Sequence, residues 1–273
     1  TQRRLEVPVQ TLEPLEILER WPYLNVDDIV GGTFCPEDGY ADPYLVVMGL
    51  AMAARRLGVR IEELTAVIGI TSTDDTLTGV MTSRGPVSSP VVVNAAGPWA
   101  ADVGRLARAT LPVQPVRRQA FMTRPFDALP RPVPMIIDQD AAFYFRGAAP
   151  GLIMGMSDPD EPPSFNLHTD REFMERVVET AVHRAPVLEN ARILRGWAGL
   201  YEVTPDGNPI IGEVPGRRGF YCAVGFSGHG FQHGPAVGNL LSQLIVDGRS
   251  DLDLTPFALD RFGAERTGEK RVV

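Results

Sequence analysis

The feature that most restricts the fold is a glycine-rich run, GFSGHGFQHG, at residues 225–234. A strand-like segment at residues 219–224 precedes it, and the apolar spacing after it predicts a helix at about residues 235–246. Closely spaced glycines let a ligand approach the backbone, and the free N–H groups at a helix start attract an anionic or electron-rich atom. The run is therefore a candidate ligand-binding turn, with a glycine-rich packing turn as the alternative.

A flavin ring is one ligand that fits such a turn, because negative charge collects at its N1/O2 edge on reduction. The phosphate loop of a nicotinamide-binding protein has a similar arrangement of strand, GxGxxxG turn and helix. That alternative is weak, because the helix is nearly the last element and no later strand supplies the acid that binds the ribose.

A second turn of small residues, NAAGPW at residues 94–99, directly follows the apolar run of residues 91–93. A β-branched run bounded by turns is typical of a strand buried on both faces, as in a parallel sheet. Open α/β sheets bind ligands at the carboxyl ends of their strands. The turn is thus a second candidate binding segment, although a tight strand-to-helix connection explains it equally well.

The remaining pattern predicts two kinds of structure. Asp42 and Pro43 are typical of a helix start, and apolar residues then recur at helical spacing until Gly58. Strand-like segments follow at residues 66–70 and 78–81. Further on, extended segments predict an antiparallel sheet, interrupted by one helix that begins at a capping box of Thr169 and Glu172. The extended segments are residues 113–123, 135–137, 142–146 and 151–156.

Composition excludes several classes of protein. Hydrophobic residues make up 44% and charged residues 22% of the chain, which is typical of a soluble globular protein. The net charge of -8 argues against a nucleic-acid partner. Cys35 and Cys222 are too few for a disulfide framework, and we expect both to be packing residues. The chain has no apolar run of membrane-span length and no metal-ligand spacing, so we expect no membrane span, no metal and a cytoplasmic location.

Together the motifs resemble the D-amino-acid-oxidase-like superfamily of FAD enzymes, and more closely its sarcosine oxidase and dimethylglycine dehydrogenase branch. The resemblance covers nearly the whole chain, and the order of the motifs is more specific than any one of them. The motifs are DGYADP at residues 38–43, VVVNAAGPWA at 91–100, GWAGLYEVTPDGNPIIG at 196–212 and GFSGHGF at 225–231. The segments GFSGHGFQ and DLTPFALDRF are most similar to the FAD-dependent oxidoreductase domain-containing proteins, whose mitochondrial member assists respiratory complex I assembly.

The resemblance implies FAD as the cofactor and assigns residues to it. The backbone of the residue matching Val67 holds the adenine in this superfamily. Monomeric sarcosine oxidases tether FAD through a Cys where Gly199 stands here, so the resemblance implies non-covalent FAD. The AAG turn lies near the diphosphate and ring, which implies cofactor contacts for Ala95, Ala96, Gly97 and Trp99. The glycine-rich segment lies under the flavin ring, which implies contacts for Gly228, His229, Gly230, Phe231 and Gln232.

The departures from the superfamily pattern also carry expectations. The superfamily opens with a βαβ unit bearing GxGxxG, and the start of this chain has none. We therefore expect the FAD-binding layer to be incomplete at its N-terminus, with the unit cut off, lost or supplied by another chain. Tyr201 stands where amino-acid oxidases have a carboxylate-clamping Arg, and would line the substrate cavity instead. Monomeric sarcosine oxidases have a carboxylate-binding Lys where Gln232 stands and an oxygen-activating Lys where Ile153 stands, so this chain lacks both charges.

A few side chains are candidates for the chemistry itself. His229 could donate to the flavin or the substrate, or make only a structural hydrogen bond. Arg146 is the candidate cation for a substrate carboxylate, with a salt bridge at a sheet edge as the alternative. Tyr144 and Trp197 could wall an apolar pocket. His233 is expected to open the last helix. No catalytic acid or base stands out.

We therefore expect an α/β protein with an α+β substrate domain, in which a Rossmann-like FAD-binding layer is interleaved with a mostly antiparallel substrate-binding sheet. Residues 40–110 and 213–262 form the FAD-binding part and residues 111–212 the substrate-binding domain. Residues 1–39 form a substrate-side or linker segment, and residues 263–273 a charged tail that frays.

The expected reaction is hydride transfer to flavin N5 from a small amino acid or N-methyl amino acid, such as sarcosine, dimethylglycine or a proline-like substrate. We expect a dehydrogenase that passes electrons to a protein or quinone, and not an oxidase. Two alternatives stay open. One is a non-catalytic assembly factor that keeps the flavin fold, and the other is a truncated chain that needs a separate dinucleotide-binding unit.

Overall fold

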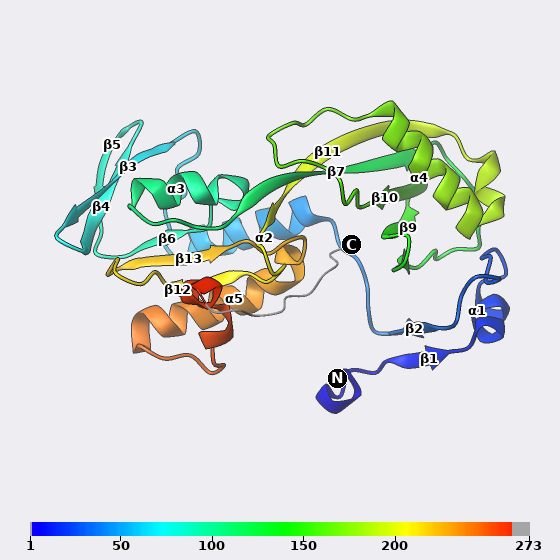
Figure 1. Cartoon of the computed structure of the whole chain (residues 1–273), viewed down its shortest axis with the longest axis horizontal. Helices are drawn as coiled ribbons and strands as arrows, with labels where there is room; N and C mark the ends of the chain where they lie inside the picture. Colours follow the sequence, from blue (N-terminus) through cyan, green and yellow to red (C-terminus); the bar gives the residue numbers. More distant parts are fainter. Residues whose placement is uncertain (1, 264–273) are drawn as a thin grey trace.

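The computed structural model describes residues 2–263, and Figure 1 shows two halves joined by two long strands. Residue 1 and residues 264–273, which hold most of the predicted tail, lie outside the described residues. The chain opens with η1 (Gln2–Leu5), β1 (Gln10–Leu12), α1 (Pro14–Arg20) and β2 (Gly32–Phe34). This N-terminal segment packs on the same core as the larger sheet, through Leu12, Ile17 and Leu24.

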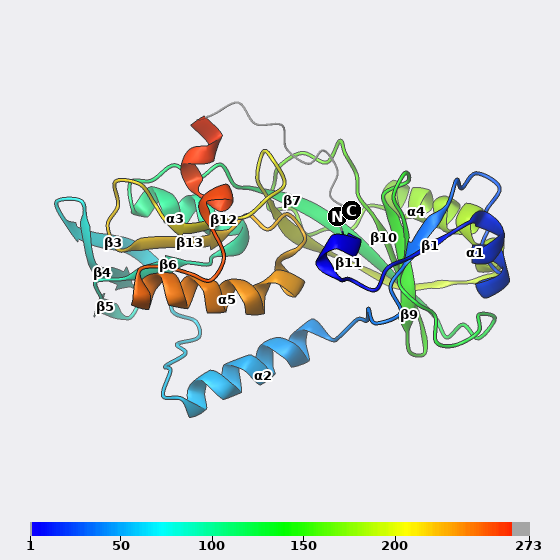
Figure 2. The same ribbon diagram turned by 90° about the horizontal axis from the view of Figure 1, so that it is seen from below.

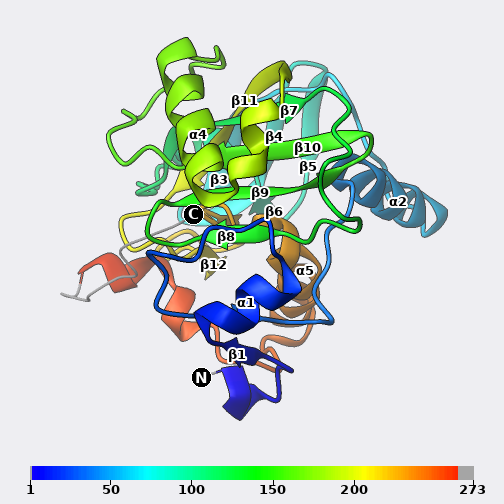
Figure 3. The same cartoon turned by 90° about the vertical axis from the view of Figure 1, so that its right-hand side faces the viewer.

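The larger sheet has five strands in the order β11-β7-β10-β9-β8, and each neighbouring pair is antiparallel, as predicted. Its strands are β7 (Gln114–Thr123), β8 (Ile136–Asp138), β9 (Phe143–Ala148), β10 (Gly151–Met156) and β11 (Ile193–Val203). One face is buried under α4 (Arg171–Arg184), as Figure 3 shows. Phe121, Phe143 and Phe145 fill this side of the sheet, with exposures of 1% or less.

The second half contains a three-stranded sheet, β12-β13-β6, covered on both faces. Its strands are β6 (Val92–Asn94), β12 (Ile210–Glu213) and β13 (Phe220–Val224). Side chains alternate along β13, so that Cys222 packs toward α3 (Ala100–Leu106) while Ala223 packs toward α5 (Gly230–Asp247). β12 belongs to this sheet, although its first residues fall within the segment predicted as substrate-binding.

Smaller elements complete this half. An antiparallel sheet of β3 (Val67–Thr73), β4 (Thr76–Thr82) and β5 (Gly85–Ser88) lies at its outer end. Its 3-10 turns are η2 (Gly97–Trp99), η4 (Thr255–Phe257) and η5 (Leu259–Gly263), whereas η3 (Pro186–Asn190) follows α4 and packs in the core of the larger sheet. No helix of the described part is long and apolar enough to cross a membrane.

Helix α2 (Pro43–Arg56) forms as predicted but stands apart from the sheets, as Figure 2 shows. Asp42 caps it, because the carboxylate accepts hydrogen bonds from the amides of Tyr44 and Leu45 at 2.9 and 3.2 Å. None of its residues is buried, and Leu45 and Leu50 are 66% and 56% exposed. Its apolar face therefore has no partner among residues 2–263.

Two helix starts differ from the sequence prediction. α5 begins at Gly230, five residues before Pro235, so His233 lies within the first turns and does not open the helix. Pro235, the sixth residue of α5, lies inside the helix, where it cannot donate a hydrogen bond to the Phe231 carbonyl. α4 is capped by Asp170 and not by Thr169, since the Asp170 carboxylate accepts from the Glu172 amide at 2.8 Å.

Candidate functional site

The two predicted binding turns lie side by side. β6 and β13 are parallel, with Cys222 paired to Asn94, so both strands end at the same edge of the sheet. Asn94 is buried and shapes the first turn: its amide donates to the Ala100 carbonyl at 2.9 Å and accepts from the Ala96 amide at 3.1 Å. The sheet topology thus places both turns at the carboxyl ends of parallel strands, as expected from the sequence.

The glycine-rich turn has a backbone that only glycine adopts easily at its tip. Gly228 has φ +98°, and a Cβ there would lie 2.4 Å from Cε2 of Tyr201. The turn is held from within by Ser227, which is fully buried and accepts a hydrogen bond from the Thr204 amide at 3.3 Å. Because α5 begins at Gly230, the first amides of the helix, beside the turn, have no intrahelical acceptor. These are the amides for which the sequence pattern predicts an anion-attracting role.

The end of β11 lies between the two turns. The ring of Tyr201 packs against Gly228, on the side of the glycine-rich turn. The Glu202 carboxylate accepts from the Phe226 amide at 3.3 Å and lies so close to Gly97 that a Cβ there would meet its Oε2 at 2.8 Å. Burial raises the pKa of the Glu202 carboxyl, because the ionised form loses hydration there. Sequence reasoning missed Glu202, which was visible only as part of the YEVTPDG motif.

The face of the five-stranded sheet that is not covered by α4 carries the predicted substrate residues. Strand register places directly opposed residues on one face: Tyr144 pairs with Gly155, Arg146 with Ile153, and Trp197 with Ala120. Tyr201 and Gly199 follow Trp197 at alternate positions of β11, so they share that face. Burial raises the pKa of Tyr144 to about 12, so its hydroxyl stays protonated and can donate a hydrogen bond.

Arg118 lies on the same uncovered face, directly opposite Gly199, and sequence reasoning missed it. Its guanidinium lies over the Tyr201 ring at 5.3 Å from the centroid. Desolvation lowers the pKa of Arg118, and its buried Nε has no hydrogen-bond partner among the described residues. The sequence pattern that could have identified Arg118 is the alternation of side chains along a strand, which places Arg117 and Arg118 on opposite faces.

The other predicted site residues occupy different environments. His229 is half-buried, and its ring stacks on His233 at 5.7 Å. Burial lowers the pKa of His233. Arg146 lies over the Tyr40 ring at 4.7 Å and donates to the Gly147 carbonyl at 2.9 Å. Several predicted cofactor contacts are exposed, with 40% to 54% exposure for Trp99, Trp197, Phe231 and Val67. Ala95 and Gln232 are exposed as well. The remaining predicted contacts lie in the turns and strands named above: Ala96, Gly97, Gly199 and Gly230.

Val67 begins β3, in the outer sheet, and so belongs to neither binding turn.

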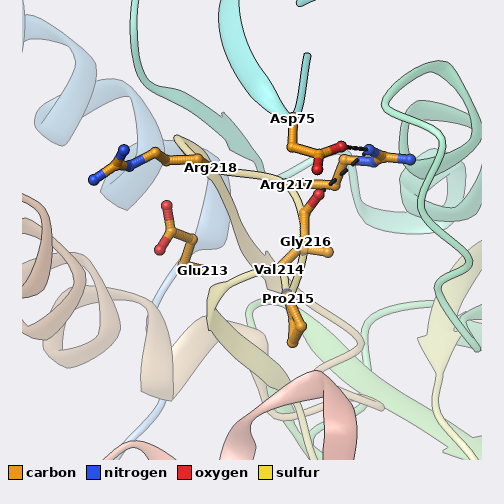
Figure 4. A pocket seen from close by; sticks show the side chains of 7 residues that line it. All are labelled: Asp75, Glu213, Val214, Pro215, Gly216, Arg217 and Arg218. Atoms are coloured by element: carbon orange, nitrogen blue, oxygen red, sulfur yellow. Dashed lines mark hydrogen bonds and ion pairs between the residues drawn. The ribbon is translucent and has the colours of Figure 1, made fainter.

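The chain also has a surface pocket of about 270 Å³ between Asp75 and Arg217, which form an ion pair at 2.8 Å (Figure 4). This pocket lies before the start of β13, whereas the glycine-rich turn follows its end. It therefore belongs to the opposite edge of the sheet. No cluster of His, Cys, Asp or Glu suited to a metal ion occurs in residues 2–263.

These two turns, together with the flanking sheets, define a flavoprotein of the amino-acid-oxidase type. The family model described as FAD dependent oxidoreductase (DAO) matches residues 1–244, and the chain belongs to this family. The predicted resemblance and fold are thereby confirmed, and FAD is the cofactor of the family.

Individual relatives agree with this assignment. Rattus norvegicus mitochondrial dimethylglycine dehydrogenase is 33% identical over 271 residues, covering 92% of this chain and 32% of the relative. Bos taurus FAD-dependent oxidoreductase domain-containing protein 1 is 27% identical, covering 96% and 61%. The crystal structure of L-proline dehydrogenase from P. horikoshii superposes with a TM-score of 0.89 at 32% identity, covering 96% and 71%. The chain thus spans about a third of the length of the dimethylglycine dehydrogenase.

The residues present fit the flavin end of FAD. The glycine-rich turn leads directly into the first amides of α5, which have no intrahelical acceptor and can bind an electron-rich ring edge. At Gly199 a Cβ would meet nothing within 4 Å, which leaves open space on the uncovered face. The 273 residues contain no GxGxxG turn for the diphosphate. These residues therefore suit the flavin ring of FAD, and the sequence offers no such turn for its diphosphate.

Proposed function

We propose that this chain forms the flavin-ring and substrate side of an FAD-dependent dehydrogenase for a small amino acid or N-alkyl amino acid. The observation that carries the proposal is the contact between Tyr201 and Gly228. It brings the uncovered face of the five-stranded sheet, with its Arg and Tyr side chains, against the turn that is suited to the flavin. The relatives named for dimethylglycine and proline support the substrate class.

The chain's own residues would bind and orient the amine. Bound FAD supplies the hydride acceptor, so the protein needs to position the substrate and exclude water. Tyr144, Trp197 and Tyr201 wall one side of the site, and the protonated Tyr144 hydroxyl can donate to the substrate. The amides at the start of α5 would stabilise negative charge on the ring edge. His229, which closes this turn, remains a candidate donor to the same edge.

Ile153 supports dehydrogenase activity over oxidase activity. Oxygen reacts with reduced flavin through superoxide, and a positive charge at the flavin face stabilises that anion. Ile153 stands on the uncovered face where the resemblance places a Lys in oxidases, and its register partner Arg146 is held over Tyr40. The electron acceptor would then be a protein or a quinone.

The proposal is tested by adding amines anaerobically to the protein in the presence of excess FAD. Sarcosine, dimethylglycine, L-proline and glycine form the panel, and loss of the visible flavin absorbance reports hydride transfer. We expect at least one of them to bleach the flavin. A protein that keeps its flavin spectrum with the whole panel would contradict the proposal and favour the non-catalytic assembly role.

A further inference from the structure

We infer that Arg118 is the anion-binding residue of the substrate site, and that the substrate is held there by its carboxylate. This inference deepens the proposed function and rests on it for the identity of the substrate. It replaces Arg146, the candidate taken from the sequence.

Arg118 is a half-buried cation without a counterion in the described structure. Its Nη1 donates to the Arg117 carbonyl at 3.0 Å, and its Nε makes no hydrogen bond there. The nearest carboxylates are already engaged: Glu161 pairs with Arg117 at 2.9 Å and Asp158 with Arg176 at 2.5 Å. A desolvated guanidinium with a free donor is costly unless an anion binds it.

The surroundings of Arg118 leave room for a small ligand. The residue directly opposite is Gly199, where an added Cβ would meet nothing within 4 Å. On the other side, the Tyr201 ring lies under the guanidinium and against Gly228. An anion bound at Arg118 therefore lies between the sheet and the glycine-rich turn, beside the place proposed for the flavin ring.

The other cations of this face are less suited to the role. Arg146 already has an aromatic and a carbonyl partner, in Tyr40 and Gly147. Arg195 lies over the ring of Trp197 and is exposed. A carboxylate matches the planar fork of Arg118, because two parallel N–H donors can bind its two oxygens. The fitting substrate is thus a small amino carboxylate.

The test uses acetate, which carries the carboxylate and cannot be oxidised at a carbon next to nitrogen. Acetate is titrated into the protein with excess FAD, and perturbation of the flavin spectrum reports binding. We expect Arg118→Met to weaken acetate binding on the order of 10- to 100-fold, as loss of charged hydrogen bonds implies. Arg118→Lys should bind with intermediate affinity, because the charge remains and the fork is lost. Arg171→Met, at a site 87% exposed on α4, is the matched control and should bind as the parent does.

Two further measurements distinguish carboxylate binding by Arg118 from a purely structural role. For an amine that bleaches the flavin, Arg118→Lys should raise the KM for the amino acid and leave the KM for its methyl ester unchanged. Unchanged acetate affinity in Arg118→Met, or a loss that appears only in Arg146→Met, would overturn the inference. Because acetate binding needs no turnover, Arg118-dependent binding without oxidation of any amine would contradict the proposed function alone.

Discussion

At the scale of single residues, neighbours in the sequence have opposite roles. Arg117 forms a buried ion pair with Glu161, with side-chain exposures of 11% and 6%, while Arg118 on the other face has no counterion among residues 2–263. Tyr201 and Glu202 differ in the same way: one packs on the glycine-rich turn, and the other lies against Gly97. Strand alternation is the cause, because successive side chains leave a strand in opposite directions.

Glu202 should make the stability of the fold depend on pH. Its pKa is raised above the ordinary value of 4.5 by burial, so the folded protein binds this proton more tightly than the unfolded chain does. The free energy of unfolding therefore falls as the pH rises through the folded-state pKa. Glu202→Gln keeps the acceptor for the Phe226 amide and does not ionise.

We expect the parent protein to lose stability relative to Glu202→Gln as the pH rises from 4.5 to neutrality. Urea unfolding of both proteins across this range measures the effect, and all other titrating groups cancel in the difference. Two stability curves that stay parallel over the whole range would show that Glu202 does not carry this proton linkage.

At the scale of elements, the glycine-rich turn depends on β11 as much as on its own glycines. The backbone at Gly228 has a left-handed φ of +98°, and the Tyr201 ring occupies the space of its missing Cβ. Glu202 holds the same turn through the Phe226 amide. A change in the turn should therefore move β11, and with it the substrate face.

Gly228→Ala should weaken FAD binding and lower the free energy of unfolding by about 1–3 kcal/mol, because of the strained φ and the clash with Tyr201. Gly238→Ala is the matched control, since its Cβ meets nothing within 4 Å within α5. The control should be as stable as the parent or more stable by about 0.5–1 kcal/mol. Fluorescence titration with FAD measures the affinity, and denaturant unfolding measures the stability. Equal FAD affinity and equal stability of the two variants would show that the turn does not require glycine at position 228.

At the scale of the whole molecule, the features that suit FAD gather at its flavin end. The ring side has two turns and a helix start, whereas the sequence contains no GxGxxG turn for the diphosphate. α2 also presents apolar side chains with no partner in the described residues.

We therefore expect the 273-residue chain to bind FAD with a Kd weaker than about 1 μM, because a helix start at the diphosphate normally contributes much of the affinity. Quenching of flavin fluorescence during titration gives the Kd. A submicromolar value would mean that the ring side alone suffices.

Oxygen reactivity should be low and should respond to charge at Ile153. We expect Ile153→Lys to speed reoxidation of the reduced flavin by about tenfold or more, because the ammonium would stabilise superoxide. Ile153→Met keeps the size without the charge and should match the parent. Stopped-flow mixing of reduced protein with air-saturated buffer compares the three, and a parent as fast as Ile153→Lys would refute dehydrogenase character.

The sequence by itself determined much of the local structure: the capped helix after Asp42, four of the five strands of the larger sheet, and the two turns of small residues. These follow from dihedral preferences and from hydrophobic spacing, which act over a few residues. The tertiary structure alone decided that α5 begins at Gly230, that Arg118 faces Gly199, and that Glu202 lies between the turns. Those outcomes depend on the register of strands far apart in the chain, because only pairing selects which face of a strand is covered and which cation stays without a counterion.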